Sequence, residues 1–184
     1  MQPEITDQEL IKKYLKGDEK SFEILIAKYL KQIYNFVYRN VGSQADAEDI
    51  TQEAFVKVWK NLKKFDQKKN FKPWLFQIAK NTSIDFLRKK KSIPFSRFEN
   101  DKGQNVLTEN LSAPLPNLTE TISDRETIAT AMSDLSKKEQ NVISLRNKEG
   151  MSFKEISGVL KESINTVKSR YRRGLKNMKK NIRN

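Results

Sequence analysis

The chain of 184 residues carries 36 lysine and arginine residues against 23 aspartate and glutamate residues, a formal net charge of +13. Such a balance attracts polyanions, although ribosomal-type and membrane-surface proteins are equally basic. There is no cysteine, which excludes disulfides and thiolate metal sites, and no histidine, the commonest general base and metal ligand. We therefore expect neither an enzyme nor a cofactor. No apolar run is long enough for a transmembrane helix or a signal peptide, so we expect a cytoplasmic protein without membrane insertion.

Helical periodicity runs through the first 91 residues, and the length suits two small domains. Asp7 is the expected N-cap of a short helix, and a longer helix follows the break at Gly17. Ser43 is the expected N-cap of a third helix, and Pro73 marks the start of a fourth. The apolar stripe of the second helix is assigned to the core and consists of Phe22, Leu25, Ile26, Tyr29, Leu30, Ile33 and Val37.

The third helix has an acidic face that is unusual in so basic a chain. Asp46, Asp49 and Glu53 repeat at positions i, i+3 and i+7, and Gln52 lies beside them. The carboxylates fit a solvated face near a helix N-terminus, or a docking surface for a basic partner protein. A carboxylate metal site would also need ligands from other elements, and no histidine or cysteine offers them.

The fourth helix and the loop before it predict a contact with nucleic acid. Asn81, Asp85 and Arg88 share one helical face, with Lys80 adjacent. The loop of residues 65–71 is basic and contains Asn70, with Phe65 and Phe71 at its two ends, a combination suited to holding unstacked bases against rings. These phenylalanines and Trp74 also fit as core aromatics, and for Trp74 the core position is favoured.

Residues 92–119 carry several prolines and no sustained periodicity, which predicts a linker. Beyond it, Ser136 and Ser152 each precede a glutamate by three residues, forming two predicted capping boxes, and Ser163 is the expected cap of the last helix. That helix has a predicted core side formed by Ile164, Val167, Tyr171, Leu175 and Met178. Its other side carries basic and hydrogen-bonding residues, namely Asn165, Lys168, Ser169, Arg172 and Arg173. A helix-turn-helix needs such a face to bind the DNA major groove, but the same face also fits an ordinary solvated helix surface.

Three strings, in this order, resemble the bacterial extracytoplasmic-function (ECF) sigma factors of RNA polymerase. DAEDITQEAFVKVW at residues 46–59 is similar to the family's polymerase-binding helix, and FKPWLFQIAKNTSIDFLRKKK at residues 71–91 is similar to its minus-ten helix. TVKSRYRRGL at residues 166–175 is similar to the minus-thirty-five recognition helix, except that Gly174 replaces a common alanine. The resemblance implies an all-α fold with sigma domain 2 at residues 5–91, a flexible linker at 92–119 and sigma domain 4, a helix-turn-helix, at 120–184.

The resemblance also assigns roles to residues. Asp46, Asp49, Gln52 and Glu53 would bind the basic coiled coil of the polymerase's largest subunit. The minus-ten strand would meet Phe65, Asn70, Phe71, Lys80, Asn81, Asp85 and Arg88. The minus-thirty-five duplex would meet Asn165, Lys168, Ser169, Arg172 and Arg173. The implied partners are core RNA polymerase, promoter DNA as duplex and as melted non-template strand, and an anti-sigma factor.

Two other classes of protein share part of this pattern. An operator-binding helix-turn-helix regulator would explain the basic last helix, but neither the acidic face nor the minus-ten features. A metal-dependent nuclease would have only Asp46, Asp49 and Glu53 as candidate ligands, and magnesium-dependent cleavage of nucleic acid would favour it.

Overall fold

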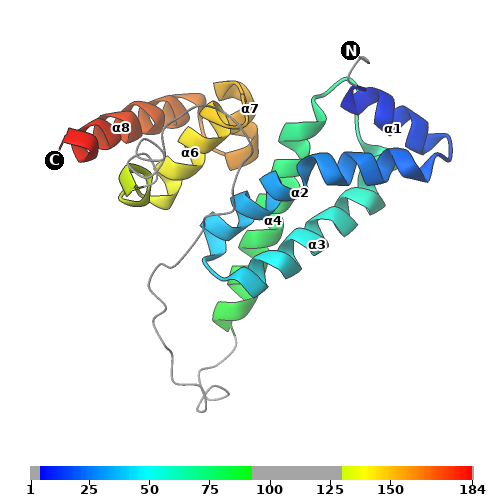
Figure 1. Cartoon of the computed structure of the whole chain (residues 1–184), viewed down its shortest axis with the longest axis horizontal. Coiled ribbons are helices and arrows are strands. Elements are labelled where there is room, and N and C mark those ends of the chain that lie inside the picture. Colours follow the sequence, from blue (N-terminus) through cyan, green and yellow to red (C-terminus); the bar gives the residue numbers. More distant parts are fainter. Residues whose placement is uncertain (1–4, 93–129, 184) are drawn as a thin grey trace.

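The computed structural model describes residues 5–92 and 130–183, which are helical without any strand (Figure 1). The first group of helices is α1 (Asp7–Leu15), α2 (Glu19–Val41), α3 (Gln44–Asn61), the short 3-10 turn η1 (Leu62–Lys64) and α4 (Phe71–Ser92). Residues 130–133 are also helical and precede α6 (Lys137–Asn147), α7 (Phe153–Leu160) and α8 (Ile164–Arg183). The all-α prediction is confirmed, whereas the predicted linker lies outside the described residues except for Ser92.

The first group forms one domain in which α2, α3 and α4 pack side by side and α1 covers one end (Figure 1). Each helix turns one apolar face inward, so that the burial of these faces holds the bundle together. The innermost side chains, which are almost inaccessible to water, are Leu10, Ile11, Leu25, Ile33, Phe36, Ile50, Leu75 and Phe76.

The N-cap of α1 is Thr6 and not Asp7. The Thr6 hydroxyl accepts a hydrogen bond from the Glu9 amide, and the Glu9 carboxylate accepts one from the Thr6 amide, a complete capping box. Because Thr6 is the cap, the Asp7 side chain is available for tertiary contacts. It forms an ion pair with Lys28 at 2.9 Å and accepts a hydrogen bond from the Tyr29 hydroxyl. The cap lies one residue earlier than predicted because Thr6 has the extended backbone that the capping position needs.

The predicted starts of two other helices agree more closely with the structure. Ser43 caps α3 as predicted, accepting from the Asp46 amide. Helix α4 begins at Phe71, one residue before the start predicted at Lys72 and Pro73. Pro73 lies in the first turn, as expected, where its missing N–H costs no hydrogen bond.

The second group, α6 to α8, is the predicted helix-turn-helix. Both capping boxes are present, Ser136 with Glu139 and Ser152 with Glu155, and the Ser163 hydroxyl accepts from the Thr166 amide at the start of α8. The shared core of these helices contains Val142, Leu145, Met151, Ile156, Val159 and Val167.

The inward face of α8 differs from the prediction. Ile164 and Leu175 are 39% and 40% exposed, whereas Gly174 is buried against α6. A Cβ atom at Gly174 would lie 2.7 Å from Ile143 Cδ1 and 3.3 Å from Glu139 Cβ. The missing side chain therefore lets α8 approach α6 closely.

The two groups of helices contact each other directly. Helix α7 packs along α4, and α6 meets α2. Figure 1 shows α7 near the middle of the molecule, while the C-terminal end of α8 extends away from the first domain. Among the described helices, none combines the length and the apolar character that a membrane span requires.

Candidate nucleic-acid interfaces and protein-docking surface

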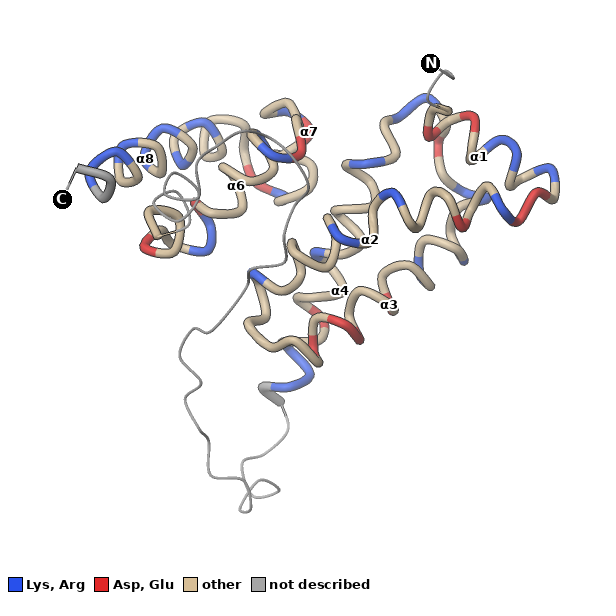
Figure 2. Tube along the Cα trace, viewed as in Figure 1, with Lys and Arg blue, Asp and Glu red and all other residues tan. Residues whose placement is uncertain are grey.

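Charge is distributed unevenly over the described residues. Figure 2 shows basic residues repeated along α8 and gathered at the end of α4, whereas the start of α3 is acidic. A surface of each sign can therefore meet a different partner.

Two of the three carboxylates on the acidic face of α3 form ion pairs within the chain. Asp46 pairs with Lys90 of α4 at 2.8 Å, and its side chain is 19% exposed. Glu53 pairs with Lys57 at 2.8 Å, one helical turn away. Two of the four predicted docking residues are thus partly neutralised within the chain. In the part of the chain that the structure describes, no group of three or more histidine, cysteine, aspartate or glutamate side chains could hold a metal ion.

Asp49 and Gln52 are exposed, and no described residue pairs with either side chain. Gln52 lines a groove of about 320 Å³ between α2 and α3, together with Leu30, Lys31, Tyr34, Glu48 and Thr51. The Gln52 amide therefore lies at the edge of a hollow that is open to solvent, and Asp49 is exposed on the same helix.

Apolar side chains that the sequence analysis did not assign to docking are exposed on the same two helices, and one of them, Leu30, lines this groove. Leu30, predicted to be core, is 48% exposed, and Val56 and Trp59 on α3 are 47% and 53% exposed. Val56 follows Gln52 by four residues and Trp59 by seven, so all three lie along one outward side of α3. This spacing was readable in the sequence and is the signal that could have found them. We name Leu30, Gln52, Val56 and Trp59 the α2–α3 patch.

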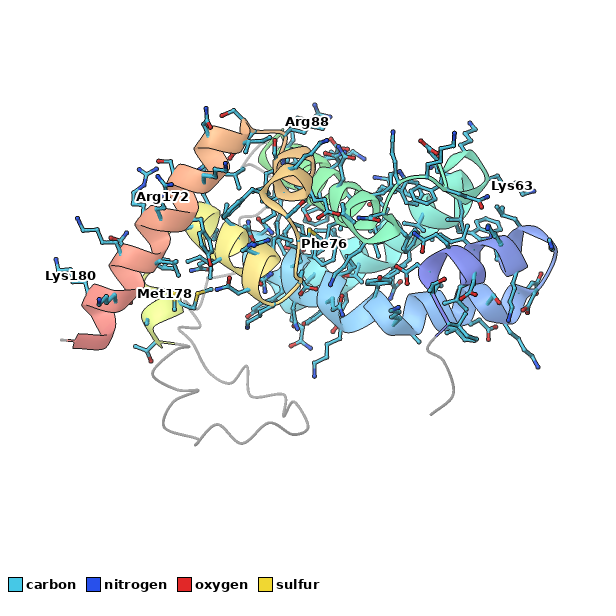
Figure 3. All side chains as sticks on the ribbon, turned by 90° about the horizontal axis from the view of Figure 1, so that it is seen from above. Lys63, Phe76, Arg88, Arg172, Met178 and Lys180 are labelled. Carbon is cyan, nitrogen blue, oxygen red and sulfur yellow. The ribbon has the colours of Figure 1, made fainter. Side chains whose placement is uncertain are left out.

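A second groove, of about 490 Å³, runs along α4. Asn81 and Asp85 line it with Trp74 and Ile78 on the same helix, facing Lys57, Asn61 and Lys64. Arg88 continues this row and pairs with Asp85 at 3.4 Å (Figure 3 shows Arg88 at the edge of the domain). The structure therefore brings together three of the predicted minus-ten residues, Asn81, Asp85 and Arg88. We name this hollow the α4 groove.

The burial of the aromatic residues around the start of α4 is the reverse of the prediction: the two phenylalanines are buried, and the tryptophan is partly exposed. Phe65 and Phe71 are only 7% and 1% exposed, and their rings meet edge to face with centroids 5.8 Å apart. They are core residues in this conformation, contrary to the expectation that they hold bases. Trp74 packs against both rings but remains half-buried and lines the α4 groove. It offers the aromatic surface that the two phenylalanines were expected to supply.

Lys80 and Asn70 point away from the α4 groove, toward the second domain. Lys80 donates to the Leu160 carbonyl at the end of α7, and Asn70 donates to the Glu155 carboxylate at 2.6 Å. Burial lowers the pKa of Lys80, and the neighbouring Glu162 carboxylate partly offsets this. Burial raises the pKa of Glu155, but hydrogen bonds from Asn70 and Ser152 outweigh it, so that the net shift is downward. Lys80 and Asn70 therefore do not join Asn81 in the α4 groove, and their assignment to the minus-ten strand stays a prediction.

The residues of the predicted basic face of α8 are exposed to solvent. Asn165, Lys168, Ser169 and Arg172 are exposed and together line a shallow hollow. Figure 3 shows Arg172 and Lys180 projecting from α8 on the side away from α6, with Met178 on the α6 side. Arg173 lies at the margin, where its Nε atom is 3.9 Å from a Glu139 carboxylate oxygen.

Comparison with known proteins identifies the family. Models of sigma-70 region 2 and sigma-70 region 4 match residues 25–93 and 131–180. The chain is 33% identical over 177 residues to the ECF RNA polymerase sigma factor SigW of Bacillus subtilis, covering 94% of this chain and 95% of that protein. The chain belongs to the ECF sigma factors. It is 32% identical to the ECF RNA polymerase sigma-E factor of Escherichia coli K12, covering 92% and 91% of the two chains.

A solved structure supports the fold of this sigma factor. The sigma factor RpoE of Bartonella quintana, in complex with the anti-sigma factor NepR, matches with a TM-score of 0.67 at 22% identity, covering 89% of this chain and 98% of that one. Region 2 of the present sigma factor contains the acidic face and the α4 groove, and region 4 contains α8. A sigma factor directs promoter-specific initiation of transcription, and its relatives are not classical enzymes.

Proposed function

We propose that this sigma factor divides initiation among three surfaces on two domains, residues 5–91 and 120–184, joined by a linker at 92–119. The α2–α3 patch with Asp49 binds core RNA polymerase, the α4 groove takes the melted non-template strand, and the exposed face of α8 binds the upstream duplex. The observation that carries this proposal is the α4 groove. A regulator that only binds an operator needs α8 but has no use for a second nucleic-acid surface on another domain.

The docking surface combines apolar area with uncompensated negative charge. Val56 and Trp59 supply apolar surface of the kind that dominates the centre of protein interfaces. Asp49, which has no intrachain ion pair among the described residues, supplies attraction for a basic helix of the polymerase. Asp46 and Glu53 contribute less in this arrangement, because Lys90 and Lys57 already compensate them.

The α4 groove suits a single strand. Trp74 presents an aromatic surface for an unstacked base, and the Asn81 amide can both donate to and accept from a base edge. The nearby Lys64 can neutralise a phosphate. Stacking contributes about 1–3 kcal/mol for each base, which is enough to offset the few kcal/mol that unpairing costs. The groove thus stabilises the opened promoter, and the polymerase performs the chemistry.

The exposed face of α8 suits duplex DNA. Arg and Lys match guanine edges and phosphates, whereas Asn and Ser bond to bases or to the backbone. Much of the affinity is then phosphate-driven and falls with salt, while base contacts of about 1–3 kcal/mol each select the promoter.

Regulation of these surfaces follows from the same proposal. RpoE of Bartonella quintana was solved with an anti-sigma factor. We propose that an antagonist of this class keeps the present sigma factor from binding the polymerase. The sigma factor then acts inside the cell, where the polymerase works.

Run-off transcription tests the function. The purified chain is mixed with core RNA polymerase and a genomic fragment library, and transcripts are mapped with and without the chain. Discrete start sites that appear only with the chain are expected. Operator binding without new start sites would support a helix-turn-helix regulator instead, and magnesium-dependent cleavage of the fragments would support a nuclease.

A further inference from the structure

The turn between α7 and α8 contains a strained residue. The connection consists of residues 161–163, and the last of them, Ser163, caps α8. Among the described residues, Lys161 alone combines a side chain with a positive φ, here 53°. A residue with a Cβ atom is strained in this left-handed conformation, which persists only where surrounding contacts hold it. The turn therefore depends on contacts that fix its shape.

Glu162 is bonded to both helices of the helix-turn-helix. Its amide donates to the Ser157 carbonyl at 3.1 Å, and the Ser157 hydroxyl donates to the Glu162 carbonyl at 2.5 Å. The Glu162 carboxylate forms an ion pair with Arg170 of α8. The backbone of Glu162 is thus bonded to α7 and its side chain to α8, so this residue joins the two helices at the turn.

Arg170 points away from the other basic residues of α8. Its side chain is 15% exposed, and it lines a hollow of about 200 Å³ with Asn141 of α6 and Leu160 of α7. Lys168 and Arg172 are exposed on the face predicted to meet DNA. Position 170 is two residues from each of them, which is about 200° around the helix. Arg170 therefore does not belong to the surface that would bind the duplex.

A second contact between α7 and α8 involves the other end of α7. The Phe153 and Tyr171 rings meet edge to face, with centroids 5.4 Å apart, and the Arg146 guanidinium of α6 lies 5.0 Å from the centroid of the Phe153 ring. Phe153 is the first residue of α7, whereas Glu162 follows its last turn. Contacts at both ends of α7 fix the angle between the two helices, and the Glu162–Arg170 pair is one of them.

We propose that Arg170 and Glu162 are positioning residues for promoter recognition. Their ion pair holds the strained turn, and it thereby sets the angle at which the exposed face of α8 enters the major groove. Without the pair, the turn relaxes and α8 loses the geometry of its contacts with base edges, while its attraction to phosphates remains. This inference rests on the proposed role of α8 in binding the upstream duplex.

Net charge makes a different prediction for residues that act on DNA only through their charge. Glu162→Gln removes a negative charge and would then tighten DNA binding, whereas Arg170→Gln removes a positive charge and would weaken it. As positioning residues, both should instead lose preference for the upstream element when substituted. Lys12→Gln and Glu23→Gln are the matched controls, since they make the same changes of charge at exposed positions of the first domain.

Sequence preference is measured with the full chain bound to core RNA polymerase. The complex selects fragments from a duplex library randomised at the upstream element, and affinities for the selected sequence and for the bulk library are compared at two salt concentrations. In Glu162→Gln and Arg170→Gln the ratio of these affinities should fall about tenfold, the loss of roughly one base contact. The slope of affinity against salt concentration should equal that of the charge control. A lost phosphate contact at Arg170 would instead weaken all sequences alike and lower this slope by about one, which would contradict the positioning role.

The two residues should act as one unit. Combining Glu162→Gln with Arg170→Gln should lose no more preference than either single substitution, because each already breaks the pair. Arg170→Lys keeps a cation beside Glu162 and should retain more of the preference than Arg170→Gln. Losses that simply multiply in the double variant would show that the two side chains act separately, and would overturn the proposal.

Loss of folding must be separated from loss of orientation. Val159→Ala truncates a side chain of α7 that is 1% exposed, so it destabilises the same domain without touching the ion pair. Urea unfolding gives the stability of each variant. Val159→Ala should keep the parent preference in its folded fraction. Equal losses of preference in Val159→Ala and Arg170→Gln, at equal stability, would reduce Arg170 to a residue that supports folding alone.

The parent complex separates this inference from the proposed function. If it shows no preference at the upstream element, the proposed role of α8 is itself rejected. If it shows the preference and both Glu162→Gln and Arg170→Gln keep it, only the positioning role is lost.

Discussion

Trp59→Lys should remove polymerase binding without unfolding the first domain. The Trp59 side chain is 53% exposed, and a tryptophan offers up to about 250 Å², so an interface could cover roughly 130 Å² of it. At about 25 cal/mol per Å², this contact is worth roughly 3 kcal/mol, or about a hundredfold in affinity. The introduced charge also opposes a basic partner, which adds to the loss.

The stability of the domain should change little, because the lysine stem can cover the same apolar surface and lysine is a good helix former. Leu15→Lys is the matched control. It adds the same charge at an apolar residue that is 37% exposed, on α1 and away from the α2–α3 patch. Affinity for core polymerase is measured by fluorescence anisotropy, and stability by urea unfolding. Equal affinities of the two variants, at equal stability, would refute the assignment of the α2–α3 patch to polymerase docking.

Three further outcomes follow from the described geometry. Asn81→Ala should reduce promoter opening more than duplex binding, and permanganate footprinting on a matched and a pre-melted promoter separates the two steps; equal losses in both would remove Asn81 from the strand contact. Lys168→Ala should cost about 1–3 kcal/mol of duplex-binding free energy at one base position if the side chain reads a base, whereas Arg172→Ala should lower the slope of affinity against salt concentration by about one if it binds phosphate. Binding of a duplex library at two salt concentrations distinguishes the two effects. No change in either variant would exclude α8 from the major groove. Gly174→Ala should gain about 1 kcal/mol of helix propensity and lose about 1–3 kcal/mol to the contact with Ile143, a loss that Ile143→Val relieves; strictly additive unfolding free energies in the double variant would contradict the close approach of α6 and α8.

Local features of this sigma factor were predictable because they depend on neighbours in the chain. The capping boxes at Ser136 and Ser152 need only a serine and a glutamate three residues apart, and both formed. The error at α1 is of the same local kind. Thr6 with Glu9 satisfies the same pattern as the two serines, so applying that rule there would have found the cap.

Other predictions depended on which neighbour covers a helix, and periodicity does not contain this information. Leu30 continues the apolar stripe of α2, yet it is 48% exposed because α3 and α4 cover only part of that helix. Phe71 and Trp74 lie three residues apart on α4, and Phe65 packs against both rings. Phe71 is the buried ring and also meets Tyr29 of α2, with ring centroids 5.7 Å apart, a tertiary contact that periodicity does not record.

The sequence by itself determined the helices, their order, the acidic start of α3 and the basic face of α8, since each depends on residues within a few turns of one another. The tertiary structure alone decided that α7 lies along α4 and takes Lys80 and Asn70 away from the α4 groove. Residues 70 and 155 are far apart in the chain, and their contact depends on how the surfaces of the two domains fit together. Such a contact reflects the shape and hydrogen-bonding groups of whole surfaces, which no local pattern of residues records.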